Sequence, residues 1–111
     1  MKVTILGCSG GFPSSLGPAS SYLVEADGYR LVLDMGNGSM SRLLLTGSPD
    51  VDAIILSHLH VDHCGDAGSY AAFRKFHPAL EFTRGLPLYG PAGVGPRIEG
   101  IFGEPGVLDG V

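Results

Sequence analysis

The sequence predicts an α/β fold in which a mixed sheet carries helices on a face. Three observations predict it. Short aliphatic runs recur along the 111 residues, they alternate with segments of helical periodicity after an opening hairpin, and 18 glycines and 8 prolines mark the boundaries between them. Such alternation is typical of layered α/β proteins. The sequence contains no internal repeat or linker, so we expect residues 1–111 to lie in one domain.

The composition restricts the class of protein. A content of 44% hydrophobic and 16% charged residues fits a folded chain, and the formal net charge of -4 gives no general attraction for nucleic acid or an anionic membrane. No apolar run approaches the ~20 residues of a membrane span, so we expect no membrane partner. Met1-Lys2 leads directly into a strand without a secretory segment, which predicts a cytoplasmic location and reduced Cys8 and Cys64.

Three strands are predicted first. Val3–Leu6 is an apolar run that ends at glycine, and Ser21–Glu25 and Tyr29–Asp34 flank Asp27-Gly28. An Asp-Gly pair between two such runs is a strong hairpin signal, because glycine takes positive φ without strain. Residues 7–15 are dense in glycine and proline, and we interpret them as a tight crossover turn rather than a substrate-binding loop.

Helices and strands alternate in the rest of the chain. An apolar stripe at i, i+3 and i+4 predicts a helix capped by Asn37 or Ser39, and its stripe residues are Met40, Leu43 and Leu44. A strand follows over 52–56. A second helix is expected from near Asp66 to His77-Pro78, since a residue before proline avoids helical geometry, and its apolar residues are Tyr70, Phe73 and Phe76. A short strand over 86–89 and a third helix over 92–102 complete the prediction.

Three imidazoles and one carboxylate lie within six residues directly after the strand 52–56: His58, His60, Asp62 and His63. In an extended segment His58 and His60 project to the same side, and a turn after them can bring the other two to the same point. These donors suit zinc, manganese or iron. Two ions roughly 3.5–4 Å apart can hold a hydroxide and stabilise a phosphoryl transition state. The alternatives are a coincidental histidine-rich turn and a structural zinc site, although structural sites favour cysteine.

Several other polar side chains could have either a structural or a functional role. Asp34 ends a strand and is either a turn residue or a group that holds a ligating histidine by its free ring N–H. Cys64 is interpreted as a small packed side chain rather than a thiolate ligand. His77 is expected on the surface. Arg74 and Lys75 are expected on a solvated helix face, with phosphate binding as the alternative.

The segment His58-Leu59-His60-Val61-Asp62-His63 matches the His-x-His-x-Asp-His signature, and the chain resembles the metallo-β-lactamase superfamily. Three further segments resemble its ribonuclease Z-like branch, which includes cyclic-nucleotide phosphodiesterases. They are Ile5-Leu6-Gly7-Cys8-Ser9-Gly10-Gly11-Phe12-Pro13, Leu33-Asp34-Met35-Gly36-Asn37-Gly38 and Leu88-Tyr89-Gly90-Pro91-Ala92-Gly93.

The resemblance implies an αββα sandwich with two zinc ions at one edge. It implies that His58 and His60 bind the first ion, that Asp62 and His63 bind the second, that Asp62 is also the catalytic proton-transfer residue, and that Asp34 supports the motif loop.

The resemblance covers nearly all of this chain but about half of the family's domain. The later histidine, the bridging aspartate and the final histidine have no counterparts, because no histidine follows His77. We therefore expect residues 1–111 to be a partial, N-terminal half of the domain, with one apolar sheet face exposed and little activity alone.

In the complete parent we expect a metal-bound hydroxide to hydrolyse a phosphodiester, either an RNA 3′ end or a cyclic nucleotide. The superfamily hosts many chemistries, so hydrolysis of another ester, a thioester or a lactam stays open, as does a non-catalytic metal-binding module. The sequence also leaves open a homodimer.

Overall fold

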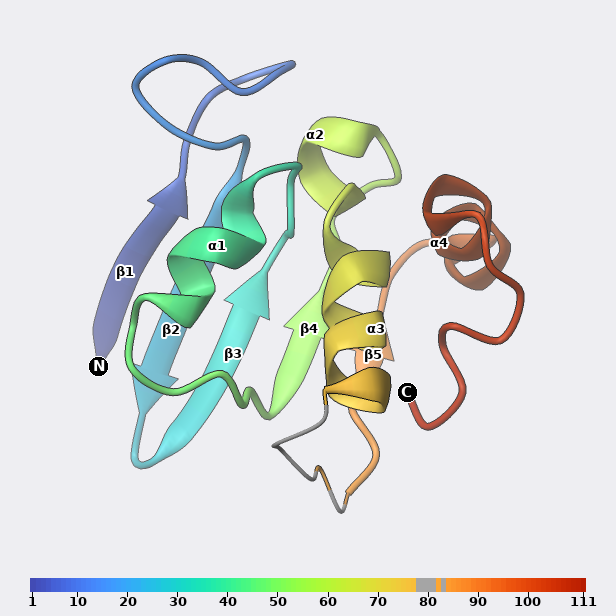
Figure 1. The fold of residues 1–111 in the computed structure, drawn as a ribbon. Helices are drawn as coiled ribbons and strands as arrows, with labels where there is room; N and C mark the ends of the chain where they lie inside the picture. The colour runs from blue at the N-terminus through green and yellow to red at the C-terminus, as the bar shows by residue number, and fades with distance from the viewer. Residues whose placement is uncertain (78–81, 83) are drawn as a thin grey trace.

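The computed structural model describes residues 1–77, 82 and 84–111, and its frame is one mixed five-stranded sheet (Figure 1). The strands lie side by side in the order β1-β2-β3-β4-β5. The first two pairings are antiparallel, and β3–β4 and β4–β5 are parallel. The strands are β1 (Lys2–Gly7), β2 (Ser21–Ala26), β3 (Tyr29–Leu33), β4 (Ala53–Ile55) and β5 (Leu88–Tyr89). The predicted mixed sheet is confirmed.

The hairpin between β2 and β3 has the predicted turn. Ala26 pairs with Tyr29, so the loop consists of Asp27 and Gly28 alone. Both take positive φ, 53° and 79°, which is the conformation of the two-residue turn that matches strand twist. This turn fixes the register that carries Leu33, the last residue of β3, to the edge of the sheet where the motif lies.

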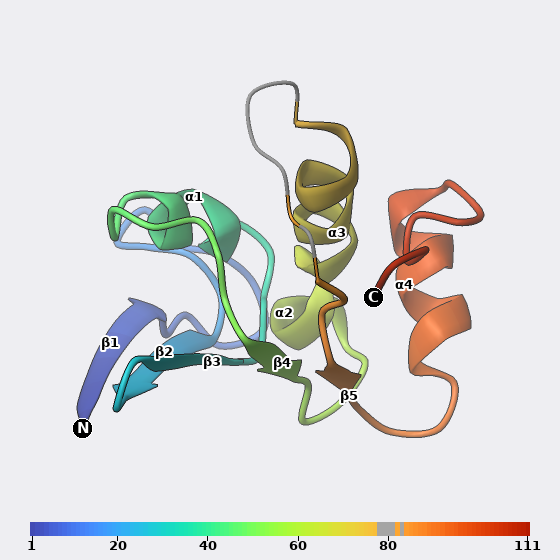
Figure 2. The same cartoon turned by 90° about the horizontal axis from the view of Figure 1, so that it is seen from below.

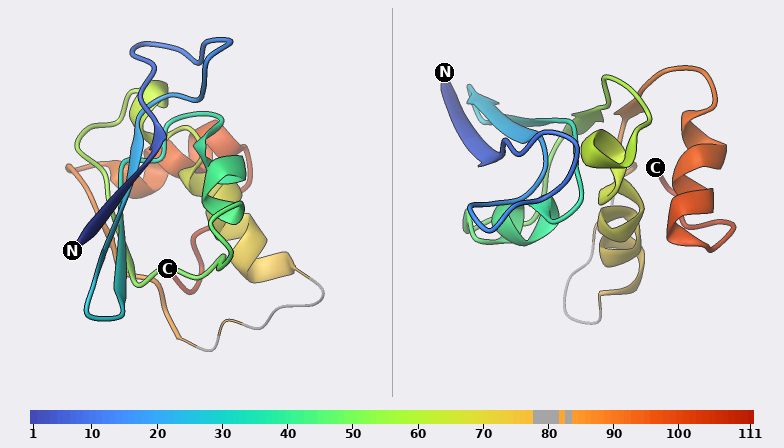
Figure 3. Two further views of the ribbon diagram at one scale, coloured as in Figure 1. Left: turned by 90° about the vertical axis from the view of Figure 1, so that its left-hand side faces the viewer. Right: turned by 90° about the horizontal axis from the view of Figure 1, so that it is seen from above.

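Four helices cover the sheet: α1 (Ser39–Leu44), α2 (Val61–Cys64), α3 (Ala67–Phe76) and α4 (Val94–Phe102). Figures 2 and 3 show all four on the same side of the sheet. The hydrophobic core lies between the two layers. Strand residues Leu23, Val32 and Ile54 meet Tyr70 of α3 and Ile98 of α4 there, and each of the five is at most 2% exposed. Among the described residues, no helix is long and apolar enough to cross a membrane.

The other face of the sheet is open and apolar. One row of directly paired residues crosses all five strands: Ile5, Tyr22, Leu33, Ile55 and Tyr89. Side chains that pair across strands share a face, and the neighbours of this row along each strand point toward the helices. Ile5 and Tyr89 at the ends of the row are 63% and 58% exposed. The expected exposed apolar face is present.

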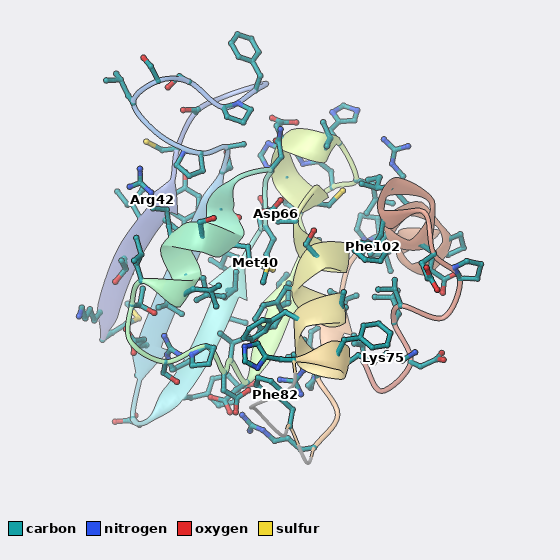
Figure 4. The ribbon with its side chains drawn as sticks, viewed as in Figure 1. Met40, Arg42, Asp66, Lys75, Phe82 and Phe102 are labelled. Atoms are coloured by element: carbon teal, nitrogen blue, oxygen red, sulfur yellow. The ribbon has the colours of Figure 1, made fainter. Side chains whose placement is uncertain are left out.

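The predicted cap of α1 is wrong. The N-cap residue is Gly38 in the left-handed conformation, and Asn37 Oδ1 and Ser39 Oγ are buried without a hydrogen-bond partner among the described residues. The N–H of Met40 donates instead to Asp66 Oδ2, 2.9 Å away at the start of α3. Figure 4 labels these two residues on their neighbouring elements. The cap comes from a residue distant in sequence, so a local capping rule does not find it.

Two residues of the predicted helical stripes are exposed. Leu44 is 39% exposed, because α1 has only six residues and ends there. Phe76 is 63% exposed in the last turn of α3, where its ring lies 5.4 Å from Lys75 Nζ. The helix ends as predicted at His77, whose N–H donates to the Phe73 carbonyl; Pro78 lies outside the described residues.

Arg74 is not on a solvated face. Its side chain is 6% exposed and pairs with Asp50 at 2.9 Å, beside Arg84, which pairs with Asp50 and Asp52. The backbone N–H of Arg30 also donates to Asp52, and this hydrogen bond, against a smaller effect of burial, lowers the pKa of the Asp52 carboxyl. These ion pairs fix the loop that leads into β4 at the end of the sheet away from the motif.

Removing the Tyr70 hydroxyl should destabilise the fold. This side chain is fully buried and its hydroxyl donates to the Pro49 carbonyl at 2.6 Å. Tyr70→Phe removes the hydrogen bond to this half-buried carbonyl, so we expect a loss of about 1–2 kcal/mol in the free energy of unfolding measured in urea. The matched control is Tyr29→Phe, at a 53% exposed tyrosine. Equal effects of the two substitutions would contradict this account of the core.

Candidate metal centre

The parallel pairing of β3 and β4 brings two segments together at one edge of the sheet. Leu33 pairs with Ile55, and the N–H of Asp34 donates to the Ile55 carbonyl at 2.8 Å. Asp34 therefore leaves β3 beside Ser57, which leaves β4. The motif begins one residue later, and its chain turns into the short helix α2 at Val61 (Figure 1). The predicted turn after the strand is thus a helical one.

Three of the four predicted ligands converge. One donor atom each from His58, Asp62 and His63 lies within 4.8 Å of the other two. The ring of His60 is centred 5.0 Å from that of His58, but His60 is exposed and is not in this group of described residues. β4 ends at Ile55, so His58 and His60 lie beyond the paired strand, although the His60 backbone is still extended with φ -71° and ψ 148°. This group contains one residue, His58, of the pair expected for the first ion and both residues, Asp62 and His63, expected for the second.

Asp34 is the hydrogen-bond acceptor at the base of this group. It is 8% exposed, and its carboxylate accepts from the Ser57 N–H (2.7 Å), from the Ser57 hydroxyl (2.8 Å) and from His63 Nδ1 (2.8 Å). Its backbone has φ 60°, a left-handed conformation that aspartate tolerates better than most residues. Of the two roles left open by the sequence, the contact with His63 Nδ1 is the one that a supporting carboxylate would make.

These hydrogen bonds determine which ring nitrogens are protonated. Asp34 is an acceptor, so the proton it shares with His63 sits on Nδ1. Ser57 has one hydroxyl proton, which it gives to Asp34, so its oxygen accepts from His58 Nδ1 at 3.0 Å. In the neutral forms of both histidines Nε2 therefore keeps its lone pair. That pair is the donor a metal ion uses.

The donor set fits a divalent cation. Nε2 of His63 lies 3.2 Å from Asp62 Oδ2. With the ring proton held on Nδ1, two electron-rich atoms face each other at this distance. Positive charge between them, either a proton or a cation, is needed to make the contact favourable. Two imidazoles and one carboxylate are also the borderline ligands that zinc, manganese and iron accept.

The loop after β1 contributes a contact to Asp62 that the sequence did not reveal. The N–H of Gly11 donates to Asp62 Oδ2 at 3.1 Å. Partial burial of Asp62 opposes ionisation, but the Gly11 N–H and the neighbouring His63 together hold the pKa of this carboxyl below its ordinary value. Asp62 is therefore a carboxylate, the form that binds cations, over the neutral pH range.

Two further residues were missed by reasoning from the sequence. Ser57 connects Asp34 to His58, although nothing in its own neighbourhood distinguished it from a strand-end serine. Gly36 lies against the Asp62 carbonyl, and a Cβ there would also meet Ala19 Cβ at 2.7 Å and Ser20 N at 2.8 Å. Only glycine fits this close approach of two loops. Its place between Asp34 and Asn37 in a glycine-rich segment was the available signal.

Cys64 is packed in the core, as the sequence predicted. Its side chain is 1% exposed, and burial raises the pKa of the thiol. A thiol in this environment stays protonated and does not act as a ligand for a metal at the surface.

The comparisons with known proteins agree with this geometry. Residues 15–99 match the family model of the metallo-beta-lactamase superfamily. An uncharacterized Mycobacterium leprae protein is 41% identical over 82% of this chain and 32% of its own length. A ribonuclease Z of Mycolicibacterium gilvum is 32% identical over 91% of this chain and 36% of its own length. The crystal structure of the metallo-beta-lactamase fold protein YhfI from Bacillus subtilis is similar with a TM-score of 0.74 and 37% identity, covering 79% of this chain and 37% of that one.

The chain thus spans about a third of the length of the curated relatives it matches. The match to the family model covers most of the residues of this chain, and the solved structure at 37% identity has a similar fold. The chain belongs to the metallo-beta-lactamase superfamily.

Proposed function

We propose that the protein is a metal-dependent hydrolase that cleaves phosphodiester bonds, in an RNA 3′ end or a cyclic nucleotide. The observation that carries this proposal is the convergence of His58, Asp62 and His63 donor atoms within 4.8 Å at an exposed edge of the sheet. When bound, a divalent cation supplies Lewis-acid activation of water and stabilises charge on phosphoryl oxygens. The ribonuclease Z relative supports the choice of bond.

The residues of the chain have separate tasks in this proposal. His58 and His63 present Nε2, and Asp62 presents its carboxylate, to the first ion, which we expect to be zinc. His60, whose ring is 5.0 Å from that of His58, joins as a further ligand after a side-chain rotation. Asp34 holds the Nδ1 protons, directly at His63 and through Ser57 at His58. Asp62 is also the group that exchanges a proton with the reacting water or leaving group.

We further propose that residues 1–111 are part of a larger catalytic domain. Four ligands are too few for two catalytic ions, each of which takes about four donors. The sequence has no histidine beyond His77 to add to the motif. The remaining ligands, and a second layer over the open sheet face, would come from residues outside these 111, so we expect this segment alone to bind metal weakly.

Replacing one converging ligand should remove the metal and the activity together. We expect His58→Ala to reduce the zinc retained in equilibrium dialysis to the level of protein-free buffer, because it removes one of the three converging donors. The full-length protein that contains residues 1–111 should hydrolyse a phosphodiester, and a metal chelator should abolish this activity. His58→Ala in the same protein should abolish it as well. His77→Ala is the matched control, because it removes an imidazole outside the motif. Unchanged zinc retention in His58→Ala would contradict the proposed site, and chelator-resistant hydrolysis would contradict the proposed function.

Asp34→Asn tests the supporting carboxylate. The amide is close in size but is uncharged, and it cannot accept from His63 and Ser57 as strongly as a carboxylate. We expect zinc affinity to fall by about 10–100-fold, the effect typical of losing such a partner. Asp50→Asn, at a carboxylate in the distant ion-pair group, should leave zinc affinity unchanged. Equal affinities for Asp34→Asn and wild type, measured by competition with a fluorescent chelator, would show that Asp34 is only a turn residue.

A further inference from the structure

The loop between β1 and β2 carries an exposed aromatic residue directly after a residue that contacts the candidate metal centre. Gly11 donates its N–H to Asp62 Oδ2, and the next residue, Phe12, is 71% exposed. Consecutive Cα atoms are about 3.8 Å apart, so the Phe12 backbone lies next to the residue that contacts the Asp62 carboxylate. A large apolar ring at this position has no packing role among the described residues, because most of its surface is in solvent.

The loop holds this position by its own hydrogen bonds. Ser14 and Gly17 exchange two backbone hydrogen bonds of 2.9 and 3.1 Å. The Ser9 N–H donates to the Pro18 carbonyl at 3.0 Å, and the Ser9 hydroxyl donates to the Gly17 carbonyl at 3.0 Å. The Gly11 contact then ties the tip to Asp62. Phe12 is therefore carried on a closed turn attached to the site, which lowers the entropic cost of using its ring as a contact surface.

The nucleobase of the proposed substrate is a group on which the Phe12 ring can stack. A nucleotide whose phosphate lies at the metal centre carries its base one sugar away, and every nucleobase has a flat aromatic face. Stacking on a protein aromatic is worth about 1–3 kcal/mol per base and tolerates all bases. The chain has a formal net charge of -4, so binding of nucleotides here depends more on the metal and on such a contact than on a basic surface.

We propose that Phe12 is a substrate contact that stacks on the nucleobase next to the scissile phosphodiester. This inference rests on the proposed function and deepens it, because it names a base-bearing nucleotide as the substrate class. It also revises the interpretation of residues 7–15, which the sequence suggested to be only a crossover turn.

The test compares two anions that differ only by the base, 5′-AMP and ribose 5-phosphate. Dissociation constants for the zinc-loaded chain are measured by NMR titration of isotopically labelled protein. We expect 5′-AMP to bind on the order of tenfold more tightly, and Phe12→Ala to remove that ratio while ribose 5-phosphate binds as before. Phe12→Tyr should keep the ratio. The adenine ring protons should shift upfield with wild type and not with Phe12→Ala.

Leu16→Ala is the matched control, since Leu16 is an apolar side chain on the same loop and is 92% exposed. It should keep the wild-type ratio. Two results would overturn the stacking inference even if diester hydrolysis were observed. One is the same preference for 5′-AMP over ribose 5-phosphate in wild type and Phe12→Ala, and the other is equal binding of the two compounds to wild type. A ratio that depends on Phe12 in a protein that neither retains zinc nor hydrolyses a diester would instead overturn the proposed function alone.

Discussion

The carboxylate of Asp34 is the group on which the geometry of the candidate metal centre depends. It accepts hydrogen bonds from the Ser57 N–H, the Ser57 hydroxyl and His63 Nδ1, and through that hydroxyl it also determines the proton position on His58. Hydrogen bonds to a charged acceptor are worth about 1.5–3 kcal/mol each. They offset the cost, on the order of 1–3 kcal/mol, of holding a residue other than glycine at positive φ. One side chain thus contacts Ser57 and His63, which are 23 and 29 residues away in sequence, and it reaches the His58 imidazole through Ser57.

The sheet makes this contact available. Asp34 and Ser57 are neighbours because β3 and β4 run parallel with Leu33 opposite Ile55. A parallel pair requires a crossover, and here α1 and its flanking loops provide it on the helical face. The first part of the crossover is held by two long-range hydrogen bonds, from Met40 to Asp66 and from Met35 to the His63 carbonyl. The same hydrogen bonds that attach this crossover to α2 and α3 therefore also hold the histidine motif in place.

Much of this arrangement could be predicted from local patterns. The Asp27-Gly28 turn, the buried strand before the motif and the end of α3 at His77 each follow from a rule that acts within a few residues. The candidate metal site could be predicted because its histidines and aspartate are adjacent in sequence, and three of these four residues converge in the structure. The cap of α1 could not, because Asp66 supplies it across the fold.

The same reasoning explains what was missed at the site. Gly11 and Ser57 act through partners that only the folded chain brings near, and the exposure of Phe76 and Leu44 depends on where their helices end. The pairing of His58 with His60 on one ion stays a prediction, since His60 lies outside the group that His58, Asp62 and His63 form. Spacing in the sequence predicted the candidate ligands, and tertiary contacts determine which of their donor atoms lie together.

The most direct test of this account is the position of the ring protons on His58 and His63 in the metal-free chain. Long-range ¹H–¹⁵N correlation spectra at about pH 8.5, where ordinary imidazoles are neutral, distinguish the two ring nitrogens. The account predicts that Nδ1 of both rings carries a proton, and that Asp34→Ala abolishes this preference at His63. Rings of His58 and His63 with a proton on Nε2 and none on Nδ1 in the unsubstituted chain would contradict it, because Nδ1 could then not donate to Ser57 or to Asp34.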